Sequence, residues 1–271
     1  MKKILLIVLL SAIVVGCKQK EQPRTTVLGF GTPYIFANEF MKGKVKEVKE
    51  TLYWAKENNN QVEKGEIVKW KELDSMKFSH SFVAYFDESG QIIKCEYFDE
   101  NGKIIDYWNG LLENGKVIKA KSFSKDSNVV NVSYKYDDNG GLVEAQIFHP
   151  IKDTLYNKWV FTNDDKLLYN KIEYYNYKNE LRGKNVLQRN ENGLVIKREY
   201  YNKNDSITFL ENLTYNNHNI LDSQENFTKG NRNKKWNFRY NNYDQNGNWS
   251  NVICSIEGKP IIFAEREYIY Y

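Results

Sequence analysis

One short pattern recurs along this chain and constrains its fold more than any other feature. An aromatic residue is followed by an acidic residue, two further positions, a glycine, one variable position and an apolar residue, at 86–92, 98–104, 136–142 and 243–249. Asn and Asp beside glycine tolerate the positive φ that a tight turn needs. With alternating apolar and polar residues on both sides, such a turn is a strong indication of a β-hairpin. The pattern predicts that the chain reverses direction at each copy.

The spacing of these turns matches one strand plus one turn. Gly90 and Gly102 are 12 residues apart, and Gly102 and Gly115 are 13 residues apart. We expect structural turns at seven glycines: Gly90, Gly102, Gly115, Gly140, Gly193, Gly247 and Gly258. Weaker turns without the full pattern, such as Lys178-Asn179 and Asn204-Asp205, continue the spacing and are interpreted as degenerate repeats. Each interval holds one strand of about eight residues, which is typical of an antiparallel meander.

The segments between the turns alternate between apolar and polar residues. Trp236, Phe238 and Tyr240 alternate with polar neighbours, and the face of 207–215 is apolar except for Glu211. This is the pattern of strands with one buried and one wet face. We predict an all-β fold: an elongated or curled antiparallel β-meander of about fifteen strands, since so long a sheet should twist, curl or close. No clear linker interrupts it, so a single domain is expected over 27–271.

The first 16 residues have the anatomy of a secretory signal. Lys2 and Lys3 precede the apolar run Ile4–Leu10, which is too short to span a bilayer. Val14-Val15-Gly16-Cys17 then resembles the bacterial lipoprotein box. The resemblance implies cleavage before Cys17, lipidation of its thiol and a lipid-anchored location in the bacterial cell envelope, at the outer membrane, on a face left undecided. The alternative is an ordinary signal peptide with an incidental cysteine.

The segment after the predicted cleavage site reads as a tether. Residues 17–26 comprise the cysteine and a polar stretch without periodicity, which is typical of a flexible linker. The formal net charge of +4 falls by two when Lys2 and Lys3 are removed. A nearly neutral exported chain gives no reason to expect nucleic acid as a partner. The predicted partners are therefore the membrane, through Cys17, and a glycan or protein ligand.

The turn pattern resembles the YD repeat of rearrangement-hotspot (RHS) proteins. The layout is also similar to YD-repeat-like lipoproteins of Bacteroidetes, with a charged opening strand at 43–50, a Tyr-Asp-x-x-Gly-Asn-Trp segment at 243–249 and an aromatic end at 266–271. The chain departs from RHS shells in having few repeats and no toxin tail. A weaker resemblance to MORN-type repeats rests on Gly102-Lys103, Gly115-Lys116 and Gly258-Lys259. These resemblances imply a repeat protein and, by analogy alone, an immunity or antitoxin-like role.

Residues that could bind metals are scattered. His80, His149 and His218 stand 69 residues apart, and none has a second His or Cys at ligand spacing. Asn242-x-Asp244-x-Asn246-Gly247 resembles half of a calcium loop, but Ile253 stands where a bidentate Glu is needed. Turn formation explains these carboxylates, and structural calcium is the minor alternative. We expect no metal and no cofactor.

Two further sets of residues bear on catalysis and redox chemistry. A glycosidase needs two facing carboxylates, and the strands offer six candidates among which the sequence selects no pair: Glu96, Glu144, Glu173, Glu199, Glu211 and Glu265. Cys95 and Cys254 would lie many strands apart in a linear meander. We expect them to be free, half-buried thiols unless the sheet closes on itself.

Repeats, an anchor and the absence of a catalytic motif favour a non-enzymatic binding or interaction scaffold in the envelope. The chain has 20 Tyr and 6 Trp residues, and cross-strand packing explains most of them. Some of them could instead form a stacking surface for a glycan or peptide. The alternatives kept open are a glycan-active enzyme that uses strand carboxylates and an immunity-like repeat protein.

Overall fold

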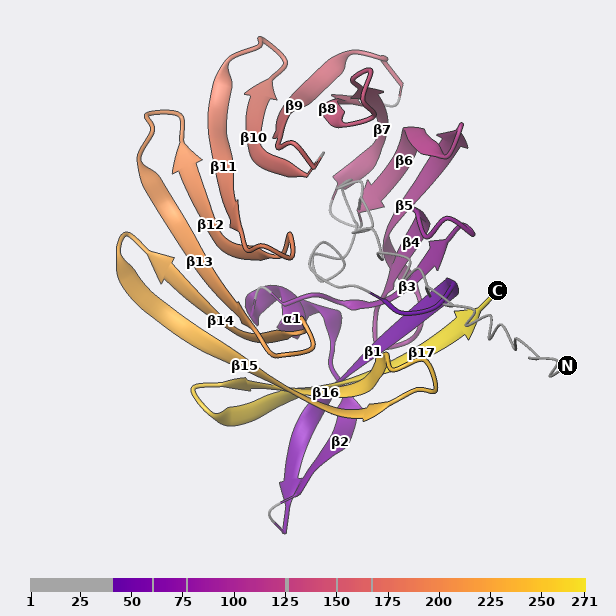
Figure 1. The fold of residues 1–271 in the computed structure, drawn as a ribbon, viewed down its shortest axis with the longest axis vertical. Helices are drawn as coiled ribbons and strands as arrows, with labels where there is room; N and C mark the ends of the chain where they lie inside the picture. The colour runs from indigo at the N-terminus through magenta and orange to yellow at the C-terminus, as the bar shows by residue number, and fades with distance from the viewer. Residues whose placement is uncertain (1–40, 60, 77, 125–126, 150, 167) are drawn as a thin grey trace, which may run out of the picture.

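The computed structural model describes residues 41–59, 61–76, 78–124, 127–149, 151–166 and 168–271. The predicted leader, Cys17, the tether and the start of the predicted domain lie outside these residues. The described part consists of 17 strands in one sheet and one short helix, α1 (Trp70–Met76) (Figure 1). The first strands are β1 (Val45–Asn58), β2 (Gln61–Ile67), β3 (Ser81–Phe86), β4 (Ile92–Phe98), β5 (Ile104–Glu113), β6 (Lys116–Ser124), β7 (Ser127–Tyr136) and β8 (Leu142–Phe148). The others are β9 (Leu155–Asn163), β10 (Tyr169–Asn176), β11 (Leu181–Arg189), β12 (Val195–Asn202), β13 (Ile207–Tyr215), β14 (Leu221–Thr228), β15 (Asn231–Tyr243), β16 (Trp249–Ile256) and β17 (Lys259–Tyr270).

The sheet closes on itself. From β3 to β17 each strand pairs antiparallel with the next, and β1 pairs with β3 on one side and with β17 on the other. Sixteen strands thus form a barrel, and β2 forms a hairpin with the far end of β1 that extends beyond the wall (Figure 1). The all-β antiparallel meander is confirmed. Closure is more specific than the elongated or curled sheet that we predicted, because local turn patterns do not determine which strand pairs with the first.

The repeated turns share one hydrogen-bonding geometry. Asp99 Oδ1 accepts the backbone N–H groups of Asn101 at 3.0 Å and Lys103 at 2.9 Å, and the Asp99 carbonyl accepts the N–H of Gly102. Gly102 has φ of 77°, where a Cβ would be strained. Counting this one, a side-chain oxygen accepts the N–H four residues later at nine turns in the described part of the chain, which begin at Asp87, Asp99, Asp137, Asp164, Asn176, Asn190, Asn202, Asn216 and Asp244.

The seven glycines singled out in the sequence all lie between strands, with φ between 73° and 92°. In the turns interpreted as degenerate, Asn179, Asp205 and Asn219 take the glycine position with φ of 61°, 64° and 60°. Asn and Asp enter this left-handed region more readily than other side chains. The weaker repeats therefore keep the same turn with a different residue.

The apolar core lies on the inner face of the wall. Trp108 is fully buried there and donates its indole N–H to the hydroxyl of Tyr134 at 3.1 Å. A second cluster surrounds α1, where Leu73 is buried and Phe78 packs at a tilt against Trp236 with ring centroids 5.0 Å apart. In the described ranges, no helix combines the length and hydrophobicity needed to cross a membrane.

A short helix interrupts the run of strands, because β2 ends at Ile67 and Trp70 begins α1. The carboxylate of Glu72 accepts the N–H of Lys69 at 3.1 Å, as in a helix cap. Packing of Leu73 and Met76 in the second cluster then favours a short helix over an extended segment.

Candidate functional site

The six carboxylates considered for catalysis are each held by a basic side chain. On the outer face, Glu96, Glu144, Glu173, Glu199 and Glu265 pair with Lys94, Lys135, Lys171, Lys197 and Lys64 at N–O distances of 2.6–3.3 Å. The sixth, Glu211, lies on the inner face and pairs with Arg198 at 2.8 Å. The outer pairs are neighbours on a wet face, so the strand pattern alone accounts for them.

Glu211, which interrupts an apolar face in the sequence, is part of a buried polar network. Its Oε1 accepts a hydrogen bond from Gln224 at 3.0 Å, and its Oε2 faces both Arg198 and the Tyr200 hydroxyl. Burial raises the pKa of the Glu211 carboxyl, and the charge of Arg198 opposes that shift. Tyr200 also has a raised pKa because of burial. These contacts stabilise a buried charge pair, which needs such partners.

The three histidines occupy separate places. Nδ1 of His149 accepts the N–H groups of Ile151 and Lys152 at 3.3 Å, so this ring caps a turn. His80 packs edge-on against Trp70 and Tyr97, and His218 lies on an exposed turn. Among the described residues, no cluster of three or more His, Cys, Asp or Glu has the arrangement of a metal site.

The half calcium loop is a turn. Asp244 Oδ1 accepts the N–H groups of Asn246 and Asn248 at 2.9 Å, and the Tyr270 hydroxyl donates to Oδ2. Burial alone would raise the pKa of Asp244, but these hydrogen bonds outweigh it and hold the pKa below its usual value. Both oxygens are therefore engaged by the protein's own donors.

Cys95 and Cys254 are free and lie on the inner face of β4 and β16. Their exposed fractions of 0% and 2% correct the expectation of half-buried thiols. Closure of the sheet turns both side chains into the interior, where burial raises the pKa of each thiol well above its usual value. Such thiols are poor nucleophiles.

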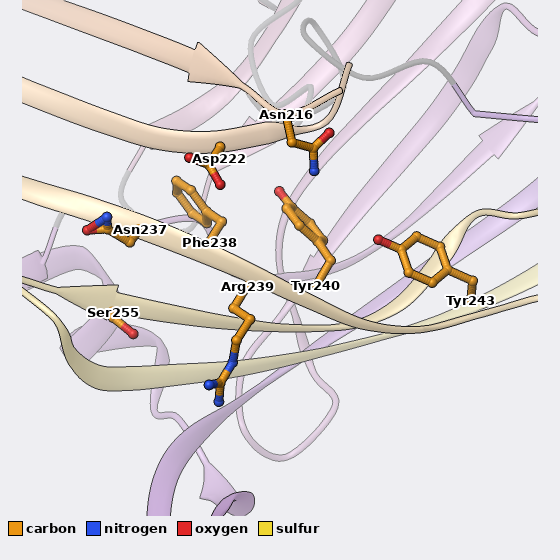
Figure 2. A pocket seen from close by; sticks show the side chains of 8 residues that line it. All are labelled: Asn216, Asp222, Asn237, Phe238, Arg239, Tyr240, Tyr243 and Ser255. Atoms are coloured by element: carbon orange, nitrogen blue, oxygen red, sulfur yellow. The ribbon is translucent and has the colours of Figure 1, made fainter. Parts of the chain in front are cut away.

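An open pocket lies where β14 and β15 separate (Figure 2). The ladder between these strands runs from Thr228 and Asn231 to Ser223 and Asn237. Beyond Asn237, β15 continues for six residues and stays paired with β16 as far as Tyr243. The gap that results has a volume of about 390 Å³. Its walls are Asn216, Asp222, Asn237, Phe238, Arg239, Tyr240, Tyr243 and Ser255.

The lining of this pocket mixes aromatic rings with polar groups. Period-two alternation sends Tyr240 to one side of β15 and Arg239 to the other, as Figure 2 shows. The Tyr240 ring packs on Trp249 with centroids 5.2 Å apart, whereas Tyr243 is 48% exposed. Within the described part of the chain, no hydrogen bond or ion pair holds the side chain of Asp222 or Arg239. Two opposite charges thus remain available to a ligand.

The sequence indicated only part of this pocket. Phe238 and Tyr240 were recognised as one face of a strand, but nothing singled out Asp222, Arg239 or Ser255. The pocket depends on the unequal lengths of β14 and β15, at eight and 13 residues. A long alternating segment after a short one is the only signal that the sequence offers for it.

No protein-family model and no curated protein matches this chain. Among solved structures, it is similar to a porin-like protein from Bacteroides uniformis, with a TM-score of 0.44, 7% identity and coverage of 85% of this chain and 100% of the other. A porin-like protein from Bacteroides vulgatus has a TM-score of 0.44 and 12% identity, with coverage of 84% of this chain and 99% of the other. A TcdB2-TccC3 structure without its hypervariable C-terminal region has a TM-score of 0.32 and 11% identity, with coverage of 78% of this chain and 11% of the other. Because these TM-scores and identities are low, the closed all-β fold is established by the strand pairing and not by these similarities.

Proposed function

We propose that this chain is a lipid-anchored protein of the bacterial cell envelope that binds a ligand without transforming it. Anchoring follows from the sequence of the leader and Cys17. In this proposal the chain is a YD-repeat-like lipoprotein, and the shared turn geometry supports that resemblance. The ligand site is the pocket between β14 and β15.

The outer face of the wall supports anchoring in preference to insertion. Lysine and glutamate pairs cover it, including Lys135 with Glu144 and Lys197 with Glu199. The apolar clusters face inward. Moving such an outer face into hydrocarbon would desolvate many charges, at a cost of several kcal/mol for each isolated ion. The wall therefore stays in water in this proposal, and the lipid on Cys17 holds the protein at the membrane.

The pocket is the observation that carries the binding function. Among the described residues of its lining, Asp222 is the single carboxylate, whereas glycoside hydrolysis generally takes two carboxyl groups on opposite sides of the bond. The six strand glutamates are occupied by basic partners and lie outside the pocket. An open, partly aromatic pocket with available polar groups fits recognition without catalysis.

Anchoring is tested by fractionating cells that express the full-length chain. We expect the wild type in the membrane pellet and release by detergent, and we expect Cys17→Ala to move to the aqueous fraction. A Cys17→Ala variant that stays in the pellet to the same extent as the wild type would contradict lipid anchoring.

Ligand binding is tested in cells with a photocrosslinking amino acid at Tyr243, which is 48% exposed in the pocket. Tyr156 is 59% exposed on β9 and provides a matched control position. We expect a discrete adduct from position 243 and none from position 156. Equal labelling from both positions, or none from either, would count against a binding pocket.

A further inference from the structure

We infer that the pocket between β14 and β15 binds a neutral oligosaccharide. The inference rests on the proposed binding function and adds the chemical class of the ligand. Its basis is the combination of one exposed tyrosine ring, planar polar side chains and opposite charges that line one open gap of about 390 Å³. That volume is within the range of small-molecule sites.

The aromatic part of the lining suits the apolar face of a sugar ring. Tyr240 is held in place by its contact with Trp249, and Tyr243 stands half-exposed beside it (Figure 2). The exposed Tyr243 ring offers a flat apolar surface with a hydroxyl at its tip. A pyranose presents a patch of C–H groups on one face and hydroxyls around its rim, and it can contact both parts of such a ring.

The polar part of the lining suits the hydroxyl rim. The Asp222 carboxylate accepts hydrogen bonds, the Arg239 guanidinium donates them, and the Asn237 amide does both. The formal charges of Asp222 and Arg239 cancel, so the lining does not favour a phosphorylated or strongly acidic ligand. A neutral molecule with many hydroxyls satisfies these groups, whereas an apolar ligand would leave them without partners.

An extended peptide is the main competitor, since β15 has an unpaired ladder edge beyond Asn237. Two features oppose an added strand. Asn242 has φ of 53°, which breaks the extended backbone only five residues after the last ladder pair. The turn that begins at Asn216 also borders the gap, where an added strand would have to lie. The side chains therefore carry recognition in this inference.

The test uses the full-length lipidated protein in detergent and isothermal titration calorimetry. The probes are maltotetraose, cellotetraose, xylotetraose and chitotetraose, with tetragalacturonate as a charged comparison. We expect at least one neutral tetrasaccharide to bind, and Tyr243→Ala and Asp222→Ala each to weaken that binding about tenfold. Tyr156→Ala should leave binding unchanged. Circular dichroism checks that each variant is folded.

Three outcomes would overturn the assignment. The first is that no neutral probe binds with a Kd below about 10 mM, a range that covers weak single-site affinities. Alternatively, a neutral probe binds but Tyr243→Ala and Asp222→Ala have no effect, or tetragalacturonate binds more tightly than every neutral probe. If saccharides fail while crosslinking from position 243 still gives a discrete adduct, the ligand class is wrong and the binding function stands. If both fail, the binding function itself is wrong.

Discussion

The seam that closes the barrel contains a buried ion pair whose removal should destabilise the fold strongly. Glu50 on β1 and Arg266 on β17 face each other in the ladder, with Arg266 Nε 2.7 Å from Glu50 Oε2. Their side chains are 1% and 0% exposed. The Arg266 guanidinium also lies 3.9 Å from the centroid of the Trp249 ring. We take Arg266→Met as the perturbation, because it keeps most of the volume and removes the charge.

Breaking a buried ion pair from one side typically costs about 3–5 kcal/mol, because the remaining charge stays in a low-dielectric site. The next outward-facing pair on the same two strands provides the control. Lys49 and Glu267 are also opposite each other, but their N–O distance is 3.6 Å and their side chains are 49% and 68% exposed. Such a pair contributes about 0–1 kcal/mol. Lys49→Met should therefore have little effect on the free energy of unfolding.

Urea unfolding followed by tryptophan fluorescence measures both variants. With a slope of about 3 kcal/mol per M, Arg266→Met should lower the midpoint by about 1 M or more, and Lys49→Met by less than about 0.3 M. The double variant Glu50→Leu/Arg266→Met should recover most of the loss, because no isolated charge remains. An Arg266→Met midpoint within error of that of Lys49→Met would refute the reasoning. A double variant as unstable as the single one would place the cost in the Trp249 contact instead.

Three other groups give further tests. Burial raises the pKa of Asp106 to about 7 from its usual 3.8, so the folded state keeps a proton that the unfolded chain loses and stability falls as pH rises from about 4 to 7. In urea unfolding, Asp106→Asn should remove this dependence of the free energy of unfolding on pH and should be more stable than the wild type at pH 8 by about 2–4 kcal/mol. An unchanged pH dependence would contradict this. In thermal melts, Gly102→Ala should lower the stability by about 1 kcal/mol, because Gly102 has a φ of 77° although the space around an added Cβ is open. Gly110→Ala should lower it by about 1–3 kcal/mol, because its Cβ would stand 2.7 Å from the Trp108 ring. Equal melting temperatures for both variants and the wild type would contradict this expectation. Cys95 and Cys254 should react with a thiol reagent only after unfolding, and rapid reaction of the native protein would show that the interior opens.

The local chemistry of the chain predicts the turns and strands well. Asp99, Gly102 and their equivalents act through hydrogen bonds and a backbone angle within five residues, so the pattern is visible in any short window. Period-two alternation likewise identifies Trp236 and Phe238 as inner-face residues. Both signals are properties of neighbouring residues, which a single sequence contains directly.

The features that the sequence left open depend on distant residues. Glu50 and Arg266 are 216 positions apart, and nothing near either one marks it as the partner of the other. The thiols of Cys95 and Cys254 are buried because the sheet closes, and the pocket at Tyr240 exists because two strands differ in length. Sequence periodicity gives the face of each strand, but the register at the seam and the gap in the wall come from how all strands fit together.

The degenerate repeats connect these two levels. Asn179, Asp205 and Asn219 keep the left-handed turn position without glycine, so loss of the sequence pattern does not mean loss of the hairpin. Every described turn of this kind therefore returns the chain beside its predecessor, and successive strands can add in one direction until the last meets the first. Because right-handed twist accumulates with each added strand, a sheet of this length curls. Pairing of β17 with β1 then satisfies the two edges that an open sheet would expose. The tolerance of the turn for Asn and Asp is thus what allows so irregular a set of repeats to form a closed wall.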